Sequence, residues 1–568
     1  MLHRKSRCSD RSSQGAGNTR LRATLAAVLL AASVALGEGP NAPASDRVLY
    51  NGIELPAVWP PVREITYEPM AVPYLASPPA VIPIDVGRQL FVDDFLIEQT
   101  TLKRAFHLAE WYKGNPVLKP DKPWEQTINS QGQPAPCAMV FSDGVWYDPA
   151  EKIFKMWYMG GYCTATCYAT SKDGIIWEKP SLDVVSGTNI VHRVQSGPGE
   201  EWQRDSGTVW WDPKEKNPKR RYKMFLYAKG GNLEVFFSPD GVHWSELALK
   251  NKAPGDRLSV FYNPFRKMWV YNLRDYAQPP GIGRYRRYKE HADVLEGAKG
   301  DLGKAAFWVG ADRLDPPRED VNTPPELYNT DAVAYESILL GCFSIWRGQP
   351  KDRAKPNDLC LGFSRDGFHW DRPDRRPFLA PSEKYGDWNW ANIQSAGGCC
   401  LVVGDKLYFY VSGRAGVRGS PASGVCSTGL ATLRRDGFAS MEAGESEGTL
   451  TTRTVRFGGQ HLFVNADAAG GPLQAEVLDV QGQVIAPFSR ANCQPVNGDK
   501  TLLAVTWNGA PDLSAVAGRP VRFRFHLKKG RLFAFWVSPD RSGASHGYVA
   551  AGGPGFTGLM DTVGATNK

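Results

Sequence analysis

The sequence lacks the paired cysteine and histidine motifs that bind zinc. Its ten cysteines include no Cys-x-x-Cys pair, and no histidines cluster with them at a metal-ligand spacing. We therefore predict no metal site, and no motif implies an organic cofactor. Nine cysteines follow Cys8, an odd number. Cys163 and Cys167 are one candidate disulfide, whereas most of the nine are equally typical of small buried hydrophobic residues.

Beyond residue 36 the sequence has no apolar run long enough to cross a membrane. The apolar stretch at 23–36 is itself short, follows six basic residues and ends near the small residues Ala35 and Gly37. This pattern predicts a signal peptide at 1–37, and hence a secreted or periplasmic protein with no membrane association after cleavage. An uncleaved membrane anchor is the alternative.

Outside this segment the sequence has no basic tract. Residues 1–37 carry five of the eight net positive charges, so the rest of the chain lacks the basic patch of a nucleic-acid-binding protein. The content of 22% charged and 42% hydrophobic residues is ordinary for a soluble globular protein. At 568 residues, two or three domains are expected.

Turn-forming and aromatic residues are abundant: 58 Gly, 42 Pro and 18 Trp. Many turns together with large aromatic side chains are typical of all-β proteins with short strands. A Ser-x-Asp-Gly-x-x-Trp motif occurs at 171–177, 238–244 and 364–370, with a degenerate copy at 435–438. The Asp-Gly pair predicts a two-residue hairpin turn, because glycine accepts the positive φ of a type I′ turn.

A second repeated pattern consists of two strand-forming runs joined by a turn. It occurs at 145–158, 209–225 and 260–271, with looser copies at 332–346 and 396–411. The two patterns together divide 107–448 into five units, each long enough for four short strands. They predict a five-bladed β-propeller.

The flanking regions differ from the repeats. Residues 38–106 form a proline-rich extension with one strand-like run at 89–98, which we expect to dock on the propeller or close it. Residues 449–568 alternate apolar and polar residues at 473–478, 502–507, 521–527 and 532–537. This alternation predicts a C-terminal β-sandwich.

Carboxylates stand just before the inner strands of four units, at Asp143, Asp205, Asp256 and Asp331, whereas the fifth unit carries Asn392 and Gln394. Acids that converge on one channel raise one another's pKa, which suits a general acid paired with a base or nucleophile. Glycoside cleavage needs such a pair across the scissile bond. The alternative for each acid is a structural role, as the cap of a turn or as one member of an ordinary ion pair.

The five units and the segment at 115–125 resemble the five-bladed propeller glycosidases of families 32, 43, 68 and 130. More closely, nearly the whole mature chain resembles secreted planctomycete-type proteins described as similar to the family 32 N-terminal domain. The resemblance implies a five-bladed β-propeller followed by a β-sandwich, with a glycosidase site at the central channel.

In family 32, blade one carries an Asp nucleophile, blade two an Arg-Asp pair that stabilises the transition state, and blade three a Glu acid/base. By this resemblance Asp143 is the nucleophile, and Arg204 with Asp205 is the stabilising pair. Blade three offers Asp256 but no matching glutamate. Glu336 in blade four is therefore assigned as the acid, with Asp256 as the alternative.

Sugar sites also use aromatic faces and fixed hydrogen-bonding groups. Ahead of the fifth unit's inner strand stand Trp388 and Trp390, followed by Asn392 and Gln394, and Arg414 follows the next strand. Arg414 has the fork of donors that binds a carboxylate or sulfate substituent. The alternative for the tryptophans is that they fill space between blades.

These observations predict an extracellular glycoside hydrolase whose partner is a carbohydrate substrate bound at the channel, through Arg204, Asp256, Asp331 and the fifth-unit residues. Two alternatives remain open. One is a sugar-binding propeller without catalytic activity, which the incomplete family triad favours. The other is a glycoside phosphorylase, for which Arg204, Arg257 and Arg414 are the candidate phosphate ligands.

Overall fold

The computed structural model describes residues 47–129, 132–193, 203–278 and 281–564, so the predicted signal peptide lies outside the described residues. Helices in the described residues are short, namely α1 (Pro73–Ala76), α2 (Val294–Ala298), η2 (Pro123–Glu125), η3 (Pro218–Arg220), η4 (Leu302–Lys304) and η5 (Arg490–Asn492). None of them is long and apolar enough to cross a membrane. Strands make up the rest of the regular structure, which confirms the all-β prediction.

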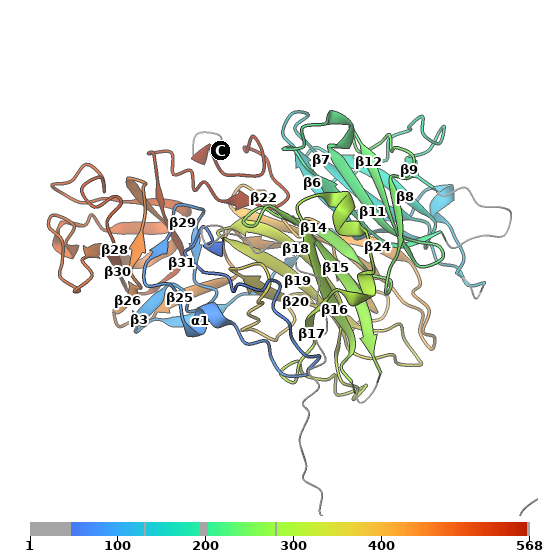
Figure 1. Ribbon diagram of the computed structural model, residues 1–568, viewed down its shortest axis with the longest axis horizontal. Coiled ribbons are helices and arrows are strands. Elements are labelled where there is room, and N and C mark those ends of the chain that lie inside the picture. Colours follow the sequence, from blue (N-terminus) through green and yellow to red (C-terminus); the bar gives the residue numbers. More distant parts are fainter. Residues whose placement is uncertain (1–46, 130–131, 194–202, 279–280, 565–568) are drawn as a thin grey trace, which may run out of the picture. The chain divides into compact units, whose positions relative to one another are not determined.

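Five antiparallel sheets form the blades of a β-propeller, as predicted, and Figure 1 labels most of their strands. Blade one contains β6 (Ala138–Asp148), β7 (Ile153–Gly160), β8 (Ala165–Ser171) and β9 (Ile190–His192). Blade two contains β10 (Arg204–Trp211), β11 (Tyr222–Ala228), β12 (Asn232–Ser238) and β13 (Leu249–Lys252). Blade three contains β14 (Ser259–Asn263), β15 (Met268–Ala277), β16 (Gly283–His291) and β17 (Ala306–Gly310).

Blade four takes a strand from the C-terminal region, and blade five takes one from the start of the repeat region. Blade four contains β18 (Glu326–Glu336), β19 (Ile338–Trp346), β20 (Asn357–Ser364) and β32 (Tyr548–Val549). Blade five contains β21 (Asn392–Ser395), β22 (Leu401–Val403), β23 (Lys406–Arg414), β24 (Cys426–Arg434) and β5 (Glu110–Trp111). Because β5 precedes blade one in sequence and pairs with β24, it joins the two ends of the repeat region and closes the ring.

The repeated Asp-Gly motif forms a wider turn than the predicted two-residue hairpin. In blade one, strand pairing ends at Thr170 and Glu178. The Ser171 hydroxyl accepts a hydrogen bond from the amide of Gly174 (2.9 Å), whose φ is 75°. The Asp173 carboxylate accepts two more backbone amides at 2.8 Å. The serine and aspartate side chains thus accept hydrogen bonds from the backbone amides of a longer loop, which is why they recur with the glycine.

A second sheet of nine strands contains residues from both flanks of the propeller. Its strands are β2 (Gln89–Leu90), β3 (Ile97–Thr100), β4 (Lys103–Phe106), β25 (Ala439–Ala443), β26 (Gly448–Thr452), β28 (His461–Leu478), β29 (Val496–Val505), β30 (Arg522–Leu527) and β31 (Gly530–Ser538). A separate parallel pair joins β1 (Ile82–Pro83) to β27 (Val455–Arg456). The strand expected at 89–98 therefore consists of two short strands, which pair with β31 and β26.

The long strand β28 belongs to both halves of this sheet. Its first half pairs with β29 and β31, and its second half pairs with β30. The two halves enclose one hydrophobic core, in which Phe523 and Phe525 of β30 pack against Phe535 of β31 at ring distances of 5.8 and 5.4 Å. The C-terminal region is thus a single sheet folded over its own core, and its description as a β-sandwich stays a prediction.

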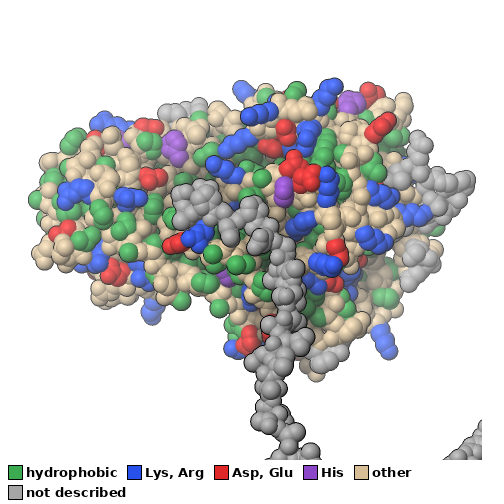
Figure 2. Space-filling model, viewed as in Figure 1, with side chains coloured by type: hydrophobic (Ala, Val, Ile, Leu, Met, Phe, Trp, Pro, Cys, Tyr) green, Lys and Arg blue, Asp and Glu red, His purple; other side chains and the backbone are tan. Residues whose placement is uncertain are grey.

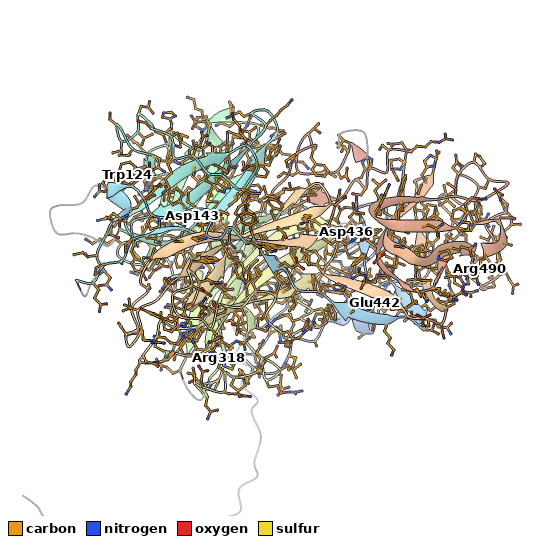
Figure 3. The ribbon with its side chains drawn as sticks, turned by 180° about the vertical axis from the view of Figure 1, so that it is seen from behind. Trp124, Asp143, Arg318, Asp436, Glu442 and Arg490 are labelled. Carbon is orange, nitrogen blue, oxygen red and sulfur yellow. The ribbon has the colours of Figure 1, made fainter. Side chains whose placement is uncertain are left out.

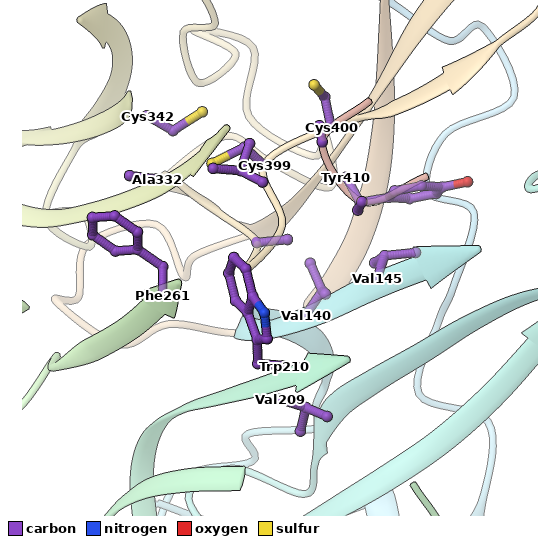
Figure 4. Close-up of a cluster of buried hydrophobic side chains, with 14 of the residues drawn as sticks. Val140, Val145, Val209, Trp210, Phe261, Ala332, Cys342, Cys399, Cys400 and Tyr410 are labelled. Atoms are coloured by element: carbon purple, nitrogen blue, oxygen red, sulfur yellow. The ribbon is translucent and has the colours of Figure 1, made fainter. Parts of the chain in front are cut away.

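The propeller core consists of the inner strands and the residues between blades. Figure 4 shows Val140, Val209, Phe261 and Ala332, one from each of the first four inner strands, converging with Cys399 of blade five. All five side chains are buried. This packing fixes the positions of the inner strands, and with them the polar residues that the same strands carry.

Candidate active site

The inner strands bring polar residues of all five blades to one region of the channel. Asp143 lies in β6, Arg204 and Asp205 begin β10, Asp331 lies in β18, and Asn392 begins β21. Asp256 and Arg257 directly precede β14. The equivalent positions that the repeats predict for the acids are therefore neighbours in space, and the contacts below connect them.

Asp143 and Arg204 form a bidentate ion pair in the propeller interior, where Figure 3 labels Asp143. Nη1 and Nη2 of Arg204 donate to the two carboxylate oxygens at 2.6 and 2.9 Å, and both side chains are buried. Burial raises the pKa of Asp143, and the Arg204 charge acts against this rise. Gly207 leaves the room for this pair, since a Cβ there would lie 3.0 Å from both side chains.

Asp331 is the centre of a second buried cluster. Its Oδ2 accepts hydrogen bonds from Ser142 (3.0 Å), from Asn329 (2.9 Å) and from Ser395. Nη2 of Arg257 donates to the Ser142 hydroxyl at 3.1 Å. This cluster links blades one, three, four and five.

Ser142 and Arg257 both have left-handed backbone conformations, with φ of 66° and 53°. A bulge interrupts the pairing of β6 with β7 between Met139 and Gly144. Such conformations are unfavourable for residues with a Cβ, and they concentrate where a fold positions functional groups. Here they turn Ser142 and Arg257 toward the cluster.

Asp205 and Asp256 are the carboxylates of the group that remain partly exposed. Burial and the negative charge of Asp256 raise the pKa of Asp205, while Arg257, Arg414 and Lys355 act against the rise. Asp256 is held in an ion pair with Arg274, with 2.8 Å between Oδ1 and Nε. The two acids thus lie close together in different electrostatic environments.

Asn392, Gln394 and Arg414 lie where the blade-five prediction places them. Gln394 donates to the side-chain oxygen of Asn392 (3.0 Å), and Asn392 donates to the carbonyl of Lys355 (2.9 Å). Arg414 pairs with Asn392 in the strand register and is buried against Tyr162. All three are fixed in place by neighbouring blades or loops.

The two tryptophans pack within blade five. Trp388 covers Gly413 and Gly429, where a Cβ would lie within 2.2 Å of the indole, and packs edge-on against Trp111 at 5.5 Å. Trp390 is buried beneath Tyr385 at a ring distance of 5.0 Å. These contacts place both indoles against residues of blade five and its loops, whereas the alternative from the sequence has them filling space between blades.

Glu336 lies apart from these residues, at the end of β18. It contacts Arg88 (3.5 Å) and Arg435 (2.9 Å), and it accepts a hydrogen bond from Ser545 at 2.7 Å. Asp436 belongs to the same ionic network, and Figure 3 shows it well separated from Asp143. The structure therefore does not bring Glu336 to Asp205 or Asp256.

The structure brings to the site several residues that the sequence alone does not identify. Asn329 stands two residues before Asp331, on the same side of β18, so strand alternation was the signal that pointed to it. Arg274 and Lys355 come from β15 and from the loop before β20. No local motif marks them, because only the propeller fold brings them to the acids.

Neither a protein-family model nor a curated protein matches the chain. Among solved structures, one named as a glycoside hydrolase matches at 13% identity and a TM-score of 0.35, over 58% of this chain and 92% of its own. A family 43 arabinoxylan arabinofuranohydrolase from Bacillus subtilis matches at 10% identity and 0.34, over 76% and 99%. The β-fructofuranosidase of Schwanniomyces occidentalis matches at 11% and 0.33, over 76% and 96%.

The chemistry available at the site comes from the partly exposed acids. A carboxylic acid with a raised pKa can donate a proton, and an ionised carboxylate beside it can act as base, nucleophile or electrostatic stabiliser. The buried pair of Asp143 and Arg204 supports this arrangement, because Nε of Arg204 donates to the backbone carbonyl of Asp205 at 2.9 Å. Asp143 thereby orients the segment that carries Asp205.

Proposed function

We propose that the protein hydrolyses a glycosidic bond in an oligo- or polysaccharide at this end of the propeller channel. The observation that carries the proposal is the pair of partly exposed carboxylates, Asp205 and Asp256, with a raised pKa on Asp205. Two such carboxyl groups are what glycoside hydrolysis requires. The signal peptide predicted at 1–37 supports a substrate that is met outside the cytoplasm.

In this proposal Asp205 is the general acid. Its raised pKa keeps a proton available for the glycosidic oxygen as the bond to the leaving group breaks. Asp256, which Arg274 holds in place at 2.8 Å, then attacks the anomeric carbon or activates a water. The chain's own residues supply both groups.

Asp143 has a positioning role in this proposal. Both of its carboxylate oxygens accept hydrogen bonds from Arg204, which leaves neither directed at a sugar. Glu336 has no part, because its contacts lie in the ionic network with Arg88 and Arg435. Asp331 accepts a hydrogen bond from the Ser142 hydroxyl, and Arg257 donates one to the same hydroxyl.

The test is sugar release from a panel of plant, algal and microbial glycans by wild type, Asp205→Asn and Asp256→Asn. Removing a general acid or its partner carboxylate is expected to slow release by about 10²- to 10⁴-fold. Asp205→Asn should also remove the alkaline limb of the pH–rate profile, since it no longer has a proton to lose. Asp301→Asn is the matched control, because this exposed carboxylate caps η4 and asparagine caps equally well.

Release that persists unchanged in both variants would overturn the assignment of the acids. If wild type releases nothing but retains a glycan that Asp205→Asn and Asp256→Asn also retain, the sugar-binding propeller without catalysis is correct instead. Reduced binding in the two variants with no release would likewise reject hydrolysis while keeping the site.

A further inference from the structure

Three cationic side chains beside the acid pair have no carboxylate partner. We call Arg257, Lys355 and Arg414 the cation cluster. Neighbouring arginines do have carboxylate partners: Arg204 pairs with Asp143, Arg274 with Asp256, and Arg284 with Glu326. Within the described part of the chain, no carboxylate lies within ion-pair distance of any member of the cation cluster.

The cation cluster converges on two aromatic rings. Arg257 lies 3.7 Å from the ring centre of Phe141, and Arg414 lies 5.5 Å from the same ring. Lys355 lies 4.7 Å from the ring of Tyr328 and donates to its hydroxyl at 2.8 Å, and Arg257 is 6.0 Å from that ring. Three cations from a loop before β14, a loop before β20 and the end of β23 therefore surround one locus.

Burial makes this arrangement costly without a ligand. Arg257 is fully buried and Arg414 is 4% exposed, yet Nε and Nη1 of Arg257 and Nε of Arg414 have no hydrogen-bond acceptor. Buried charges in folded proteins are ordinarily paired and hydrogen-bonded. On the face of the molecule in Figure 2, by contrast, basic and acidic side chains are interspersed.

Backbone contacts hold the cation cluster in place. Arg286 is buried and donates to the carbonyl of Arg257 at 2.7 Å, which fixes the left-handed segment that presents Arg257. Burial and the charges of Arg274 and Arg257 hold the pKa of Arg286 well below its usual range. Lys355, which is half-buried, is the solvent-accessible member of the cation cluster.

We infer that the cation cluster is a subsite for an oxyanion carried by the sugar, a carboxylate or a sulfate ester, so that the substrate is an acidic glycan. The inference rests on the proposed function in taking the ligand to be a carbohydrate. Lys355 is the member that can donate a charge-assisted hydrogen bond to a carboxylate or sulfate oxygen on the sugar. Arg257 and Arg414, which are buried and form no ion pair with a carboxylate of the described residues, add positive charge behind it.

The subsite also affects the acid pair. Arg257, Arg414 and Lys355 act to lower the pKa of Asp205. An anion bound among them neutralises that influence, and the pKa of Asp205 then rises further. An acidic sugar would therefore favour the protonated form of Asp205. A neutral sugar would leave the three cations to lower the pKa of Asp205.

The test is affinity electrophoresis of the folded, full-length chain through gels that contain matched polysaccharides. Polygalacturonate is paired with its fully methyl-esterified form, and a sulfated galactan with its desulfated form. We expect retardation by the acidic member of at least one pair, decreasing with added salt. Lys355→Met should weaken it on the order of tenfold, as expected for loss of a charged donor, whereas the exposed Lys304→Met should not.

Equal retardation by the acidic and neutral members, or no effect of Lys355→Met, would overturn the inference. Inorganic phosphate is a separate arm. If phosphate at millimolar concentration is consumed during cleavage, with a sugar phosphate as product, the subsite binds free phosphate and not a group on the sugar. Binding that depends on Lys355 without release of sugar would keep the subsite and reject the proposed hydrolysis, so the two failures are distinguishable.

Discussion

Burial separates the roles of individual acids at the residue scale. Asp143 and Asp331 are buried and accept hydrogen bonds from side chains of the same protein, whereas Asp205 and Asp256 retain exposed surface. A carboxylate without exposed surface cannot reach a substrate, although it can orient the residues that do. The consequences for stability can be tested one residue at a time.

The first prediction concerns the ion pair of Asp143 and Arg204. Asp143→Asn keeps the shape of the side chain but leaves the Arg204 charge buried without a counter-charge. Breaking one side of a buried pair is expected to lower the free energy of unfolding by about 3–5 kcal/mol. Urea denaturation measures this change. A loss below about 1 kcal/mol, within the range of an exposed ion pair, would show that the pair contributes little.

A second prediction concerns Asp371, which pairs with Phe363 at the outer edge of blade four. Burial and the nearby charge of Asp93 raise the pKa of Asp371 to about 6. Because the folded pKa lies above the unfolded value of about 3.9, this group favours the folded state at low pH. That contribution is lost as pH rises from about 4 to 6, at about 1.4 kcal/mol per pKa unit.

Asp371→Asn should remove this dependence and leave the protein more stable than wild type at pH 7. The measurement is the free energy of unfolding in urea at pH 4.5 and pH 7 for both proteins. The difference between them isolates Asp371 from other titrating groups. A wild type that gains stability relative to Asp371→Asn as pH rises would contradict the assigned pKa.

At the scale of elements, the turns of the blades are held by aromatic residues of neighbouring blades. The Tyr410 hydroxyl of blade five donates to the carbonyl of Gly174 in blade one at 2.6 Å. Trp157 of blade one donates to Gly241 of blade two, also at 2.6 Å. The same turn therefore shapes its own hairpin and docks the adjacent blade.

The third prediction tests this docking. Tyr410→Phe removes one hydroxyl and leaves the buried Gly174 carbonyl without that donor, so the free energy of unfolding should fall by about 1–3 kcal/mol. Tyr408→Phe is the matched control, because Tyr408 lies two residues away on the same strand and is half-buried. The denaturation midpoint should shift in Tyr410→Phe alone, with an unchanged slope. Equal shifts in both variants would count against the docking role.

The repeats could be predicted because their signals are local. Ser171, Asp173 and Gly174 make their hydrogen bonds within a few residues of one another, so the pattern is visible in the sequence. Ring closure by β5 could not be predicted, since nothing in Glu110 or Trp111 indicates a partner in β24. The fold of β28 over one core likewise depends on pairing between distant strands.

The site was predictable to the same extent. The positions of Asp143, Asp205, Asp256 and Asp331 follow from the repeats, and these residues do converge. The repeats do not show which of these acids are buried in ion pairs. Arg204 precedes Asp205 in sequence, but its guanidinium donates to Asp143 instead. Which acid stays exposed is decided by side chains that other blades contribute.

At the scale of the whole described molecule, a buried ionic network joins the propeller to its flanks. Arg88 lies before the second sheet's first strand, Glu336 ends the inner strand of blade four, and Arg435 and Asp436 follow β24. Arg88 contacts Asp436 at 2.8 Å, and Arg435 contacts Asp561 of the C-terminal segment at 3.0 Å. The network connects four separate parts of the chain.

Glu336 has the central position in this network, and we propose for it a structural role in place of the catalytic one that the sequence suggests. It contacts both arginines, so Glu336→Gln leaves two buried guanidinium groups with less counter-charge. The expected loss in the free energy of unfolding is about 3–5 kcal/mol. Sugar release by the folded fraction should keep the wild-type pH profile, because Asp205 and Asp256 are unaffected.

Both properties can be measured on one preparation of Glu336→Gln, stability by urea denaturation and activity below the onset of unfolding. Asp205→Asn serves as the opposite case, with release slowed by about 10²- to 10⁴-fold and stability less affected, since Asp205 is partly exposed. If Glu336→Gln instead folds with near wild-type stability and releases no sugar, the acid of the reaction is Glu336. The channel would then have to open toward the end of β18, and the roles assigned to Asp205 and Asp256 would fail together.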